Sequence, residues 1–493
     1  MSPSPQLATR AARGAVALTV VALASRALSF VGQLALGWFL EPAHFGLYGA
    51  ALAITSFATV LAQAGLRETL LQRSRRLALW ARLATRMALR ISFAGWAVCS
   101  VVALVWPWSP DREALRQVLP LLGAVWPLTA GALAAEARLN ARLEFKRTSR
   151  IAIGSQVVTL ALQVILAWAG LGIYALVVPY VAGAAVRTFA LRRAAGPLPR
   201  ARRAPSMRRG LLLLGRSRWA MAVTLLGMVW AWGDYLLLGL RFDTAQVGQY
   251  YFAFALATAA MLLLTQNVSA VLFPALLHLK GDGAAQWRAG YKALSLLALL
   301  GVPMCAGQVL VGQPLLRLVY GDKWAAAEWM FALLSIGMGS RVVGSSAGAV
   351  MQAQGRFRYQ AKVQASLAVL FVVFVAAGLA TGSLRWTVAA IAAFYLWVGP
   401  YNIWAAGRAH GATVRDAMAL YVRPSAWTAA AYAAALGAER AAGLAPDAWL
   451  AIAALRFCTF SVGFAALALL FERGQLEAFW SRLRPARAAA VQP

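Results

Sequence analysis

Two polar stripes interrupt the apolar N-terminal part of the sequence, and each contains an arginine. Their residues are Arg26, Ser29 and Gln33 in the first apolar run and Ser56, Thr59, Gln63 and Arg67 in the second. This spacing places the first stripe within about 60° of one helical face, and the second is similarly narrow. A cation in mid-bilayer costs about 2.5–3.5 kcal/mol on insertion scales, so it usually faces protein or a water-filled cavity. We therefore expect Arg26 to line a cavity, where its guanidinium can bind an anion through two parallel hydrogen bonds.

Polar residues in later apolar runs add further candidates. Arg341 lies in the middle of one run, where a cavity role and a structural role are equally open. Arg67 lies near the end of its run, so its side chain could equally extend to the lipid headgroups. Asp234 is an intramembrane carboxylate that either binds a coupling ion or pairs with a cavity arginine. The uncharged side chains predicted to line the cavity are Ser29, Gln33, Thr59, Gln63, Gln266 and Asn267.

The composition of the chain is that of a helical membrane protein. Of 493 residues, 61% are hydrophobic and 13% are charged, and the mean hydropathy is +0.66. A soluble domain has about twice that fraction of charged residues. The net charge of +31 comes from basic residues that lie mostly in short loops, so topology explains it and nucleic acid is not an expected partner. The three cysteines and three histidines are scattered, and they predict neither a disulfide framework nor a metal site.

Apolar runs long enough to cross a bilayer recur throughout the sequence. We predict about fourteen transmembrane helices, near residues 14–40, 45–71, 83–106, 115–139, 151–169, 173–191, 210–240, 247–277, 293–311, 325–352, 361–379, 386–406, 417–436 and 448–471. The loops that follow the even-numbered helices are rich in Lys and Arg, and the intervening loops are short and nearly neutral. Because basic loops stay in the cytoplasm, both termini are predicted to be cytoplasmic.

Two segments of the first half of the chain recur in the second half. They are Phe39–Tyr48 with Leu240–Tyr250, and Leu139–Arg147 with Met351–Tyr359. In the first pair, Gly46 and Tyr48 fall on Gly248 and Tyr250 at a shift of 202 positions. Each repeat holds six predicted helices, an even number, so the two repeats enter the membrane from the same side. A pseudo-two-fold axis along the membrane normal would relate them.

The predicted fold is therefore an all-α polytopic membrane protein with two six-helix lobes and two additional C-terminal helices. The N-terminal lobe spans residues 1–193 and the C-terminal lobe residues 210–410. Residues 194–209, rich in Pro and Arg, form a basic cytoplasmic linker between them. Residues 411–493 hold the two additional helices and a cytoplasmic tail. Arg456, in the last helix, is expected to contact lipid or to pair with a neighbouring helix.

Several segments resemble the polysaccharide transporter family, the Wzx-type flippases of O-antigen and exopolysaccharide. The segment Glu41–Arg73, "EPAHFGLYGAALAITSFATVLAQAGLRETLLQR", looks like the second-helix signature of that family. Val247–Leu276, Leu318–Ile336 and Met351–Tyr359 resemble it too, and the likeness extends from about Gly14 to about Gly411. Membership would place the chain in the multidrug/oligosaccharidyl-lipid/polysaccharide exporter superfamily. That superfamily has two six-helix lobes around a central cavity and works by alternating access.

The resemblance implies a polyprenyl-pyrophosphate-linked oligosaccharide repeat unit as substrate, moved from the inner to the outer leaflet of the bacterial inner (plasma) membrane. Arg26, Arg67 and Arg341 would then bind the anionic pyrophosphate, and the polar cavity residues would bind sugar hydroxyls. A polysaccharide polymerase and glycosyltransferases are further expected partners, and no cofactor is expected.

Two transport alternatives of the same fold stay open: a multidrug or cation antiporter and a lipid II flippase. An antiporter would need buried carboxylates, and Asp234 is the one that lies clearly within a predicted helix. An enzyme, such as a glycosyltransferase or polymerase, would need a sizeable extramembrane loop. The loops predicted to face outward are short, with Pro107–Gln117 among the longest, so no catalytic activity is expected.

Overall fold

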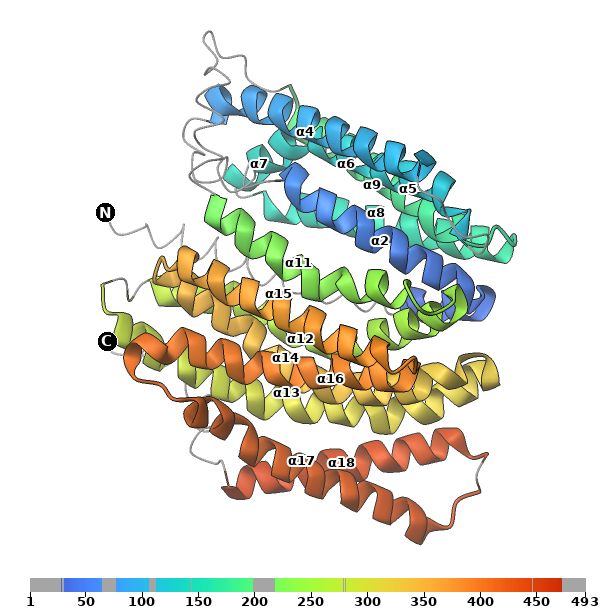
Figure 1. Ribbon diagram of the computed structural model, residues 1–493, viewed down its shortest axis with the longest axis vertical. Coiled ribbons are helices and arrows are strands. Elements are labelled where there is room, and N and C mark those ends of the chain that lie inside the picture. The colour runs from blue at the N-terminus through green and yellow to red at the C-terminus, as the bar shows by residue number, and fades with distance from the viewer. Residues whose placement is uncertain are drawn as a thin grey trace, which may run out of the picture. The chain divides into compact units, whose positions relative to one another are not determined.

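The structure, a computed structural model, describes residues 28, 31–63, 77–105, 112–142, 144–197, 218–277, 279, 281–445 and 447–471. At some helical positions, including 58–63, 77–82 and 266–271, it describes the backbone alone. Every regular element within these ranges is helical, which confirms the all-α class. The longer helices are α2 (Pro42–Gln63), α4 (Leu77–Val105), α5 (Leu115–Gly123), α6 (Val125–Ala130), α7 (Leu133–Ala141), α8 (Phe145–Trp168), α9 (Tyr174–Ala195), α11 (Arg218–Leu238), α12 (Thr244–Leu277), α13 (Gly283–Tyr320), α14 (Ala325–Ala353), α15 (Phe357–Ala380), α16 (Leu384–Gly407), α17 (Val414–Ala442) and α18 (Trp449–Phe471) (Figure 1).

The helices have the length and composition of membrane spans. Eight helical stretches within the described ranges are long and apolar enough to cross a membrane, and a ninth qualifies if one bent pair counts as a single span. The polytopic character predicted from the sequence is therefore confirmed. The total of fourteen helices stays a prediction.

One predicted span is broken into three helices. The sequence predicts a single helix over residues 115–139, whereas the structure has α5, α6 and α7 there, with a bend of 44° between residues 115–130 and 133–140. Pro127 lies in α6, four residues after Gly123, the last residue of α5, and Gly131 follows α6 at the bend. Proline removes a backbone donor and clashes with the preceding turn, and such positions commonly break helices.

Polar side chains of α9 bind the backbone at this break. Arg192 donates from Nε to the Gly131 carbonyl at 2.9 Å, and Thr188 donates from Oγ1 to the Leu128 carbonyl at 3.1 Å. Carbonyls at a helix end lack an intrahelical partner, and in a membrane they must be satisfied by protein. The broken segment is therefore held against α9 by hydrogen bonds as well as by packing.

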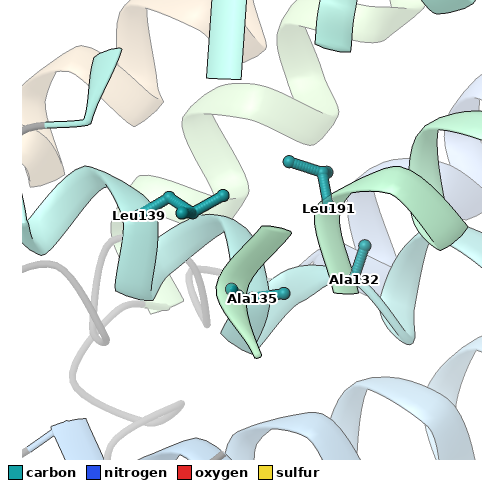
Figure 2. Packing of buried hydrophobic residues seen from close by; sticks show 5 residues of the cluster. Ala132, Ala135, Leu139 and Leu191 are labelled. Carbon is teal, nitrogen blue, oxygen red and sulfur yellow. The ribbon is translucent and has the colours of Figure 1, made fainter. Parts of the chain in front are cut away.

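The structure divides into two compact units, and the first comprises residues 1–259 and 356–391. In this unit α2 packs against α4 and α11, α8 against α9, and α11 against α15. Figure 1 shows α4, α2 and α11 running alongside one another. A small apolar cluster joins α7 to α9, and Figure 2 shows its leucines, Leu139 and Leu191, where the two helices meet.

The second unit comprises residues 260–355 and 392–493. Its core is the pair α13 and α14, and α17 and α18 pack against each other and against α13. Small residues bring α14 close to α16: a Cβ on Gly344 would lie 2.7 Å from the Cα of Gly399.

Arg456 of α18 donates from Nε and Nη2 to the Glu439 carboxylate of α17 at 2.7 and 2.9 Å. Of the two expectations for Arg456, the structure bears out the interhelix pair. The predicted division of the chain at residues 193, 210 and 410 stays a prediction.

Candidate functional site

The first unit contains a polar cavity of about 400 Å³ between α6, α8 and α9. Gln33 and Leu36 of the helical stretch 31–39, Tyr48 of α2 and Tyr251 of α12 complete its wall. This volume is in the range of pockets that hold small molecules. Gln33 is the predicted cavity residue that lines it.

One face of α8 supplies most of the polar wall. Ser155, Gln156, Thr159 and Gln163 line the cavity together with two apolar residues of the same helix. Their spacing returns to one side of the helix at every turn. Apolar side chains such as Val157 and Ile165 are exposed elsewhere on α8, at 48% and 56%. The helix therefore presents a row of polar side chains to the cavity and exposes apolar side chains elsewhere, as expected where polar groups inside a membrane face protein and not lipid.

The opposite wall comes from α9, which approaches α8 closely. A Cβ on Gly183 would lie 1.9 Å from Thr159 Oγ1, so a larger residue here would displace that hydroxyl or move the helices apart. Tyr180 and Arg187 line the cavity on either side of Gly183 along the helix. Arg187 Nη2 lies 3.3 Å from Glu136 Oε2 of α7, so a carboxylate already accompanies this cation.

The serine and threonine hydroxyls of the cavity wall donate their protons to their own helices. Ser155 Oγ donates to the Ala152 carbonyl, Thr159 Oγ1 to the Ser155 carbonyl and Thr129 Oγ1 to the Val125 carbonyl, each at 2.9 Å. A hydroxyl used in this way still has a lone pair with which to accept a hydrogen bond. The wall therefore offers hydroxyl acceptors beside glutamine amides, which both donate and accept.

One amide on the wall has a hydrogen-bonding deficit. Gln33 Nε2 is buried and has no hydrogen-bond partner among the residues that the structure describes. A buried unpaired donor costs about 1–3 kcal/mol, and such groups usually mark a site that another molecule completes. The Gln33 amide is thus available to a ligand or to water.

A close crossing of α2 and α12 positions the aromatic residues of the cavity. A Cβ on Gly46 would lie 1.9 Å from the Thr244 carbonyl oxygen, and one on Gly248 would lie 1.7 Å from that of Pro42. The two glycines are those aligned by the sequence repeat, and α2 and α12 begin at the corresponding residues Pro42 and Thr244. Beside this crossing, Tyr251 packs edge-on against a second tyrosine of the cavity wall, Tyr48, with ring centroids 5.9 Å apart.

Asp234 lies in α11 of the same unit and is fully buried, at 0% exposure. Its Oδ2 accepts a hydrogen bond from the Tyr250 hydroxyl at 2.6 Å, and its Oδ1 accepts one from the Tyr235 backbone N–H at 3.0 Å. Asp234 is not among the residues that line the cavity.

Arg341 lies in the second unit, in the middle of α14, and is 8% exposed. Its guanidinium carbon is 4.6 Å from the centroid of the Tyr395 ring of α16, and Nη1 lies 3.8 Å from the sulfur of Met338. A desolvated cation–π contact stabilises a cation by about 2 kcal/mol. Arg341 is therefore buried against an aromatic ring, and its binding of an anion stays a prediction.

The other predicted site residues cannot be placed. Arg26, Ser29 and Arg67 lie outside the described residues. The side chains of four more also lie outside the description, although their backbones belong to α2 and α12: Thr59, Gln63, Gln266 and Asn267.

The polar face of α8 was missed in the sequence, although its signal is present there. Ser155, Gln156, Thr159 and Gln163 follow helical spacing within a predicted span, as clearly as the two stripes that were recognised. Unlike the two stripes that contain arginine, this face carries no charge. Its signal in the sequence is the recurrence of uncharged polar residues at positions i, i+4 and i+8, namely Ser155, Thr159 and Gln163.

Comparison with known proteins identifies the family. A family model described as "Polysaccharide biosynthesis protein" matches residues 35–329. Succinoglycan biosynthesis transport protein ExoT of Rhizobium meliloti is 24% identical over 318 residues, which are 63% of each chain. Lipopolysaccharide biosynthesis protein WzxC of Escherichia coli is 24% identical over 358 residues, 70% of each chain. Teichuronic acid biosynthesis protein TuaB of Bacillus subtilis is 27% identical over 169 residues, so the match spans 34% of this chain and 35% of that relative. The matches to ExoT and TuaB therefore span less than two thirds of those relatives.

Solved structures show the same fold at low sequence identity. The lipid II flippase MurJ in an inward closed conformation superposes with a TM-score of 0.73 and 9% identity, covering 93% of this chain and 99% of MurJ. An inward-facing multidrug resistance transporter of the MATE family and MOP superfamily gives a TM-score of 0.62 and 12% identity, covering 82% and 98%. The family model covers more than half of the chain and agrees with the resemblance stated above. The chain belongs to the family of polysaccharide biosynthesis proteins, membrane proteins with the fold of the MOP superfamily.

Proposed function

We propose that the protein is a flippase for a polyprenyl-pyrophosphate-linked oligosaccharide repeat unit used in surface or exopolysaccharide synthesis. The family match over residues 35–329 carries this proposal. Two relatives support it by name, since one is a succinoglycan transport protein and another acts in lipopolysaccharide biosynthesis. The fold it shares with a lipid II flippase and with multidrug transporters favours a transporter over an enzyme.

The substrate would be moved from the inner to the outer leaflet of the bacterial inner membrane by alternating access. Basic loops at alternate positions in the sequence support cytoplasmic termini. Arg26, Arg67 and Arg341 are the proposed ligands of the pyrophosphate, because guanidinium groups bind phosphate oxygens bidentately. Asp234 is proposed to bind a coupling ion or to pair with one of these cations. Glycosyltransferases would supply the repeat unit, and a polymerase would consume it.

Deletion of the gene tests the proposal. If the protein is the flippase, the complete lipid-linked repeat unit accumulates in the inner leaflet and surface polysaccharide falls. Thin-layer or mass-spectrometric analysis of extracted lipids measures the first effect, and a glycan stain measures the second. Restoring the intact gene on a plasmid should reverse both.

Two other outcomes would favour the alternatives. Unchanged lipid-linked sugars together with new sensitivity to cationic drugs would indicate a multidrug or cation antiporter. Accumulation of the peptidoglycan precursor, with lysis, would indicate a lipid II flippase. Neither outcome is expected, because the family model and the named relatives concern polysaccharide synthesis.

A further inference from the structure

We propose that the cavity between α6, α8 and α9 binds the sugar part of the substrate, through residues other than the arginines proposed for the pyrophosphate. This proposal rests on the proposed function. It assigns a ligand class to residues of α8 and α9 that the sequence analysis did not single out. Gln156, Thr159 and Gln163 of α8 are its principal new members.

The chemistry of the wall excludes the other parts of such a substrate. Among the described residues that line the cavity, Arg187 is the charged one, and Glu136 already pairs with it. A pyrophosphate carries several negative charges and would need more than one free cation. A polyprenyl tail would leave the amides and hydroxyls of the wall without partners. A metal or coupling cation would need carboxylates, and the described lining contains none.

A sugar ring matches the same wall. Its adjacent hydroxyls both donate and accept, as do the amides of Gln156 and Gln163, and the wall hydroxyls have lone pairs to accept from it. The rings of Tyr48, Tyr180 and Tyr251 present apolar faces and polar hydroxyls, which suits the mixed surface of a pyranose. The polar face runs from Ser155 to Gln163 along α8, a distance of about 12 Å at 1.5 Å per residue, which accommodates more than one ring.

The unsatisfied amide of Gln33 is an independent reason to place a polar ligand here. Its Nε2 is buried and has no hydrogen-bond partner among the described residues, and a ligand hydroxyl would accept a hydrogen bond from it. The sequence places Gln33 on the same helical face as Arg26, two turns further along the chain. The sugar and the pyrophosphate could thus be bound along one face of the first helix.

The test compares two ligands on the full-length protein in lipid nanodiscs. One ligand is the lipid-linked repeat unit extracted from the producing bacterium, and the other is undecaprenyl pyrophosphate without sugar. The variants are Gln33→Leu and Gln163→Leu, which keep the approximate size and remove the hydrogen bonds. Each should weaken binding of the sugar-bearing lipid by about tenfold, as expected for one or two lost hydrogen bonds. Binding of the sugar-free lipid should change less than about twofold.

Ala161→Leu is the matched control, because Ala161 is an exposed residue of α8 on another face. It should leave both affinities unchanged. A second pair tests the site by size: Ala152→Phe, which projects a ring into the cavity, should reduce export at equal membrane abundance, and Ala161→Phe should not. This pair measures occlusion and does not depend on the amides.

Several results would overturn the assignment. Equal loss of both ligands in the glutamine variants would show a structural effect, and no loss in either variant would show that the cavity holds water alone. If the wild-type protein binds both lipids equally well, the sugar adds nothing and the cavity proposal fails while the flippase stands. If the wild-type protein binds neither lipid and the deletion strain accumulates no repeat unit, the proposed function fails as well.

Discussion

Replacing the two glycines at the crossing of α2 and α12 gives the sharpest test of the packing. In Gly46→Ala the added Cβ would lie 1.9 Å from the Thr244 carbonyl oxygen, and in Gly248→Ala it would lie 1.7 Å from that of Pro42. Real Cβ contacts are almost never shorter than 3.0 Å, so the helices must separate by at least about 1 Å. The obstacle in each case is backbone, which cannot rotate away. Over-packing of this kind costs about 1–3 kcal/mol.

The double variant adds a second expectation. One separation of the helices relieves both clashes, because each Cβ would lie at the same crossing. The free-energy loss of Gly46→Ala plus Gly248→Ala should therefore be smaller than the sum of the two single losses by about 1 kcal/mol or more. Unfolding in mixed micelles with increasing SDS, followed by tryptophan fluorescence, measures all three values.

Gly154→Ala is the matched control. Gly154 lies in α8, and a Cβ there would meet nothing within 4 Å. Alanine favours a helix over glycine by about 1 kcal/mol, so this variant should be as stable as the wild type or more stable. If Gly46→Ala behaves like Gly154→Ala, the close crossing is refuted. If the double variant loses the full sum, the two contacts are independent and the shared separation is refuted.

Three further predictions concern charged groups. Arg456→Met leaves the Glu439 carboxylate without its partner, and thermal unfolding should show that the free energy of unfolding falls by about 1–2 kcal/mol. Adding Glu439→Gln to the same chain should restore part of this loss. An unchanged unfolding midpoint in Arg456→Met would contradict a contribution of the pair to stability. Tyr250→Phe removes the hydroxyl that donates to buried Asp234, and the free energy of unfolding should fall by about 1.5–3 kcal/mol in the same assay. A stability equal to that of the wild type would show that another donor replaces the tyrosine hydroxyl. Arg26→Ala should lower export at equal membrane abundance while Arg26→Lys retains part of it, and full export by the alanine variant would remove Arg26 from the substrate site.

Sequence patterns predicted the features that depend on composition and on repeated spacing. The all-α membrane class followed from long apolar runs, and the alignment of Gly46 with Gly248 corresponds to a contact between these two residues. The interior position of Arg341 followed from the cost of exposing a cation to lipid. Each of these features is set by the residue's own type and its place in a periodic pattern.

Features that depend on long-range partners were not predicted. The break within residues 115–139 has local causes in Pro127 and Gly131, but Arg192 and Thr188 of α9 also bind the carbonyls at this break. The cavity likewise depends on the close approach of α9 to α8 at Gly183. A single sequence shows these residues but not which carbonyl or hydroxyl each one will meet.

The crossing of the two glycines also bears on how the chain arose. A Cβ on Gly46 would meet Thr244, which lies four residues before Gly248, and a Cβ on Gly248 would meet Pro42, which lies four residues before Gly46. Such reciprocity is the mark of an isologous interface, in which identical surfaces meet across a two-fold axis in a homodimer. A half-length protein with a single repeat would carry a self-complementary surface at this point. Gene fusion would convert that contact between subunits into one within a single chain, and each copy of the glycine would then restrain the evolution of the other.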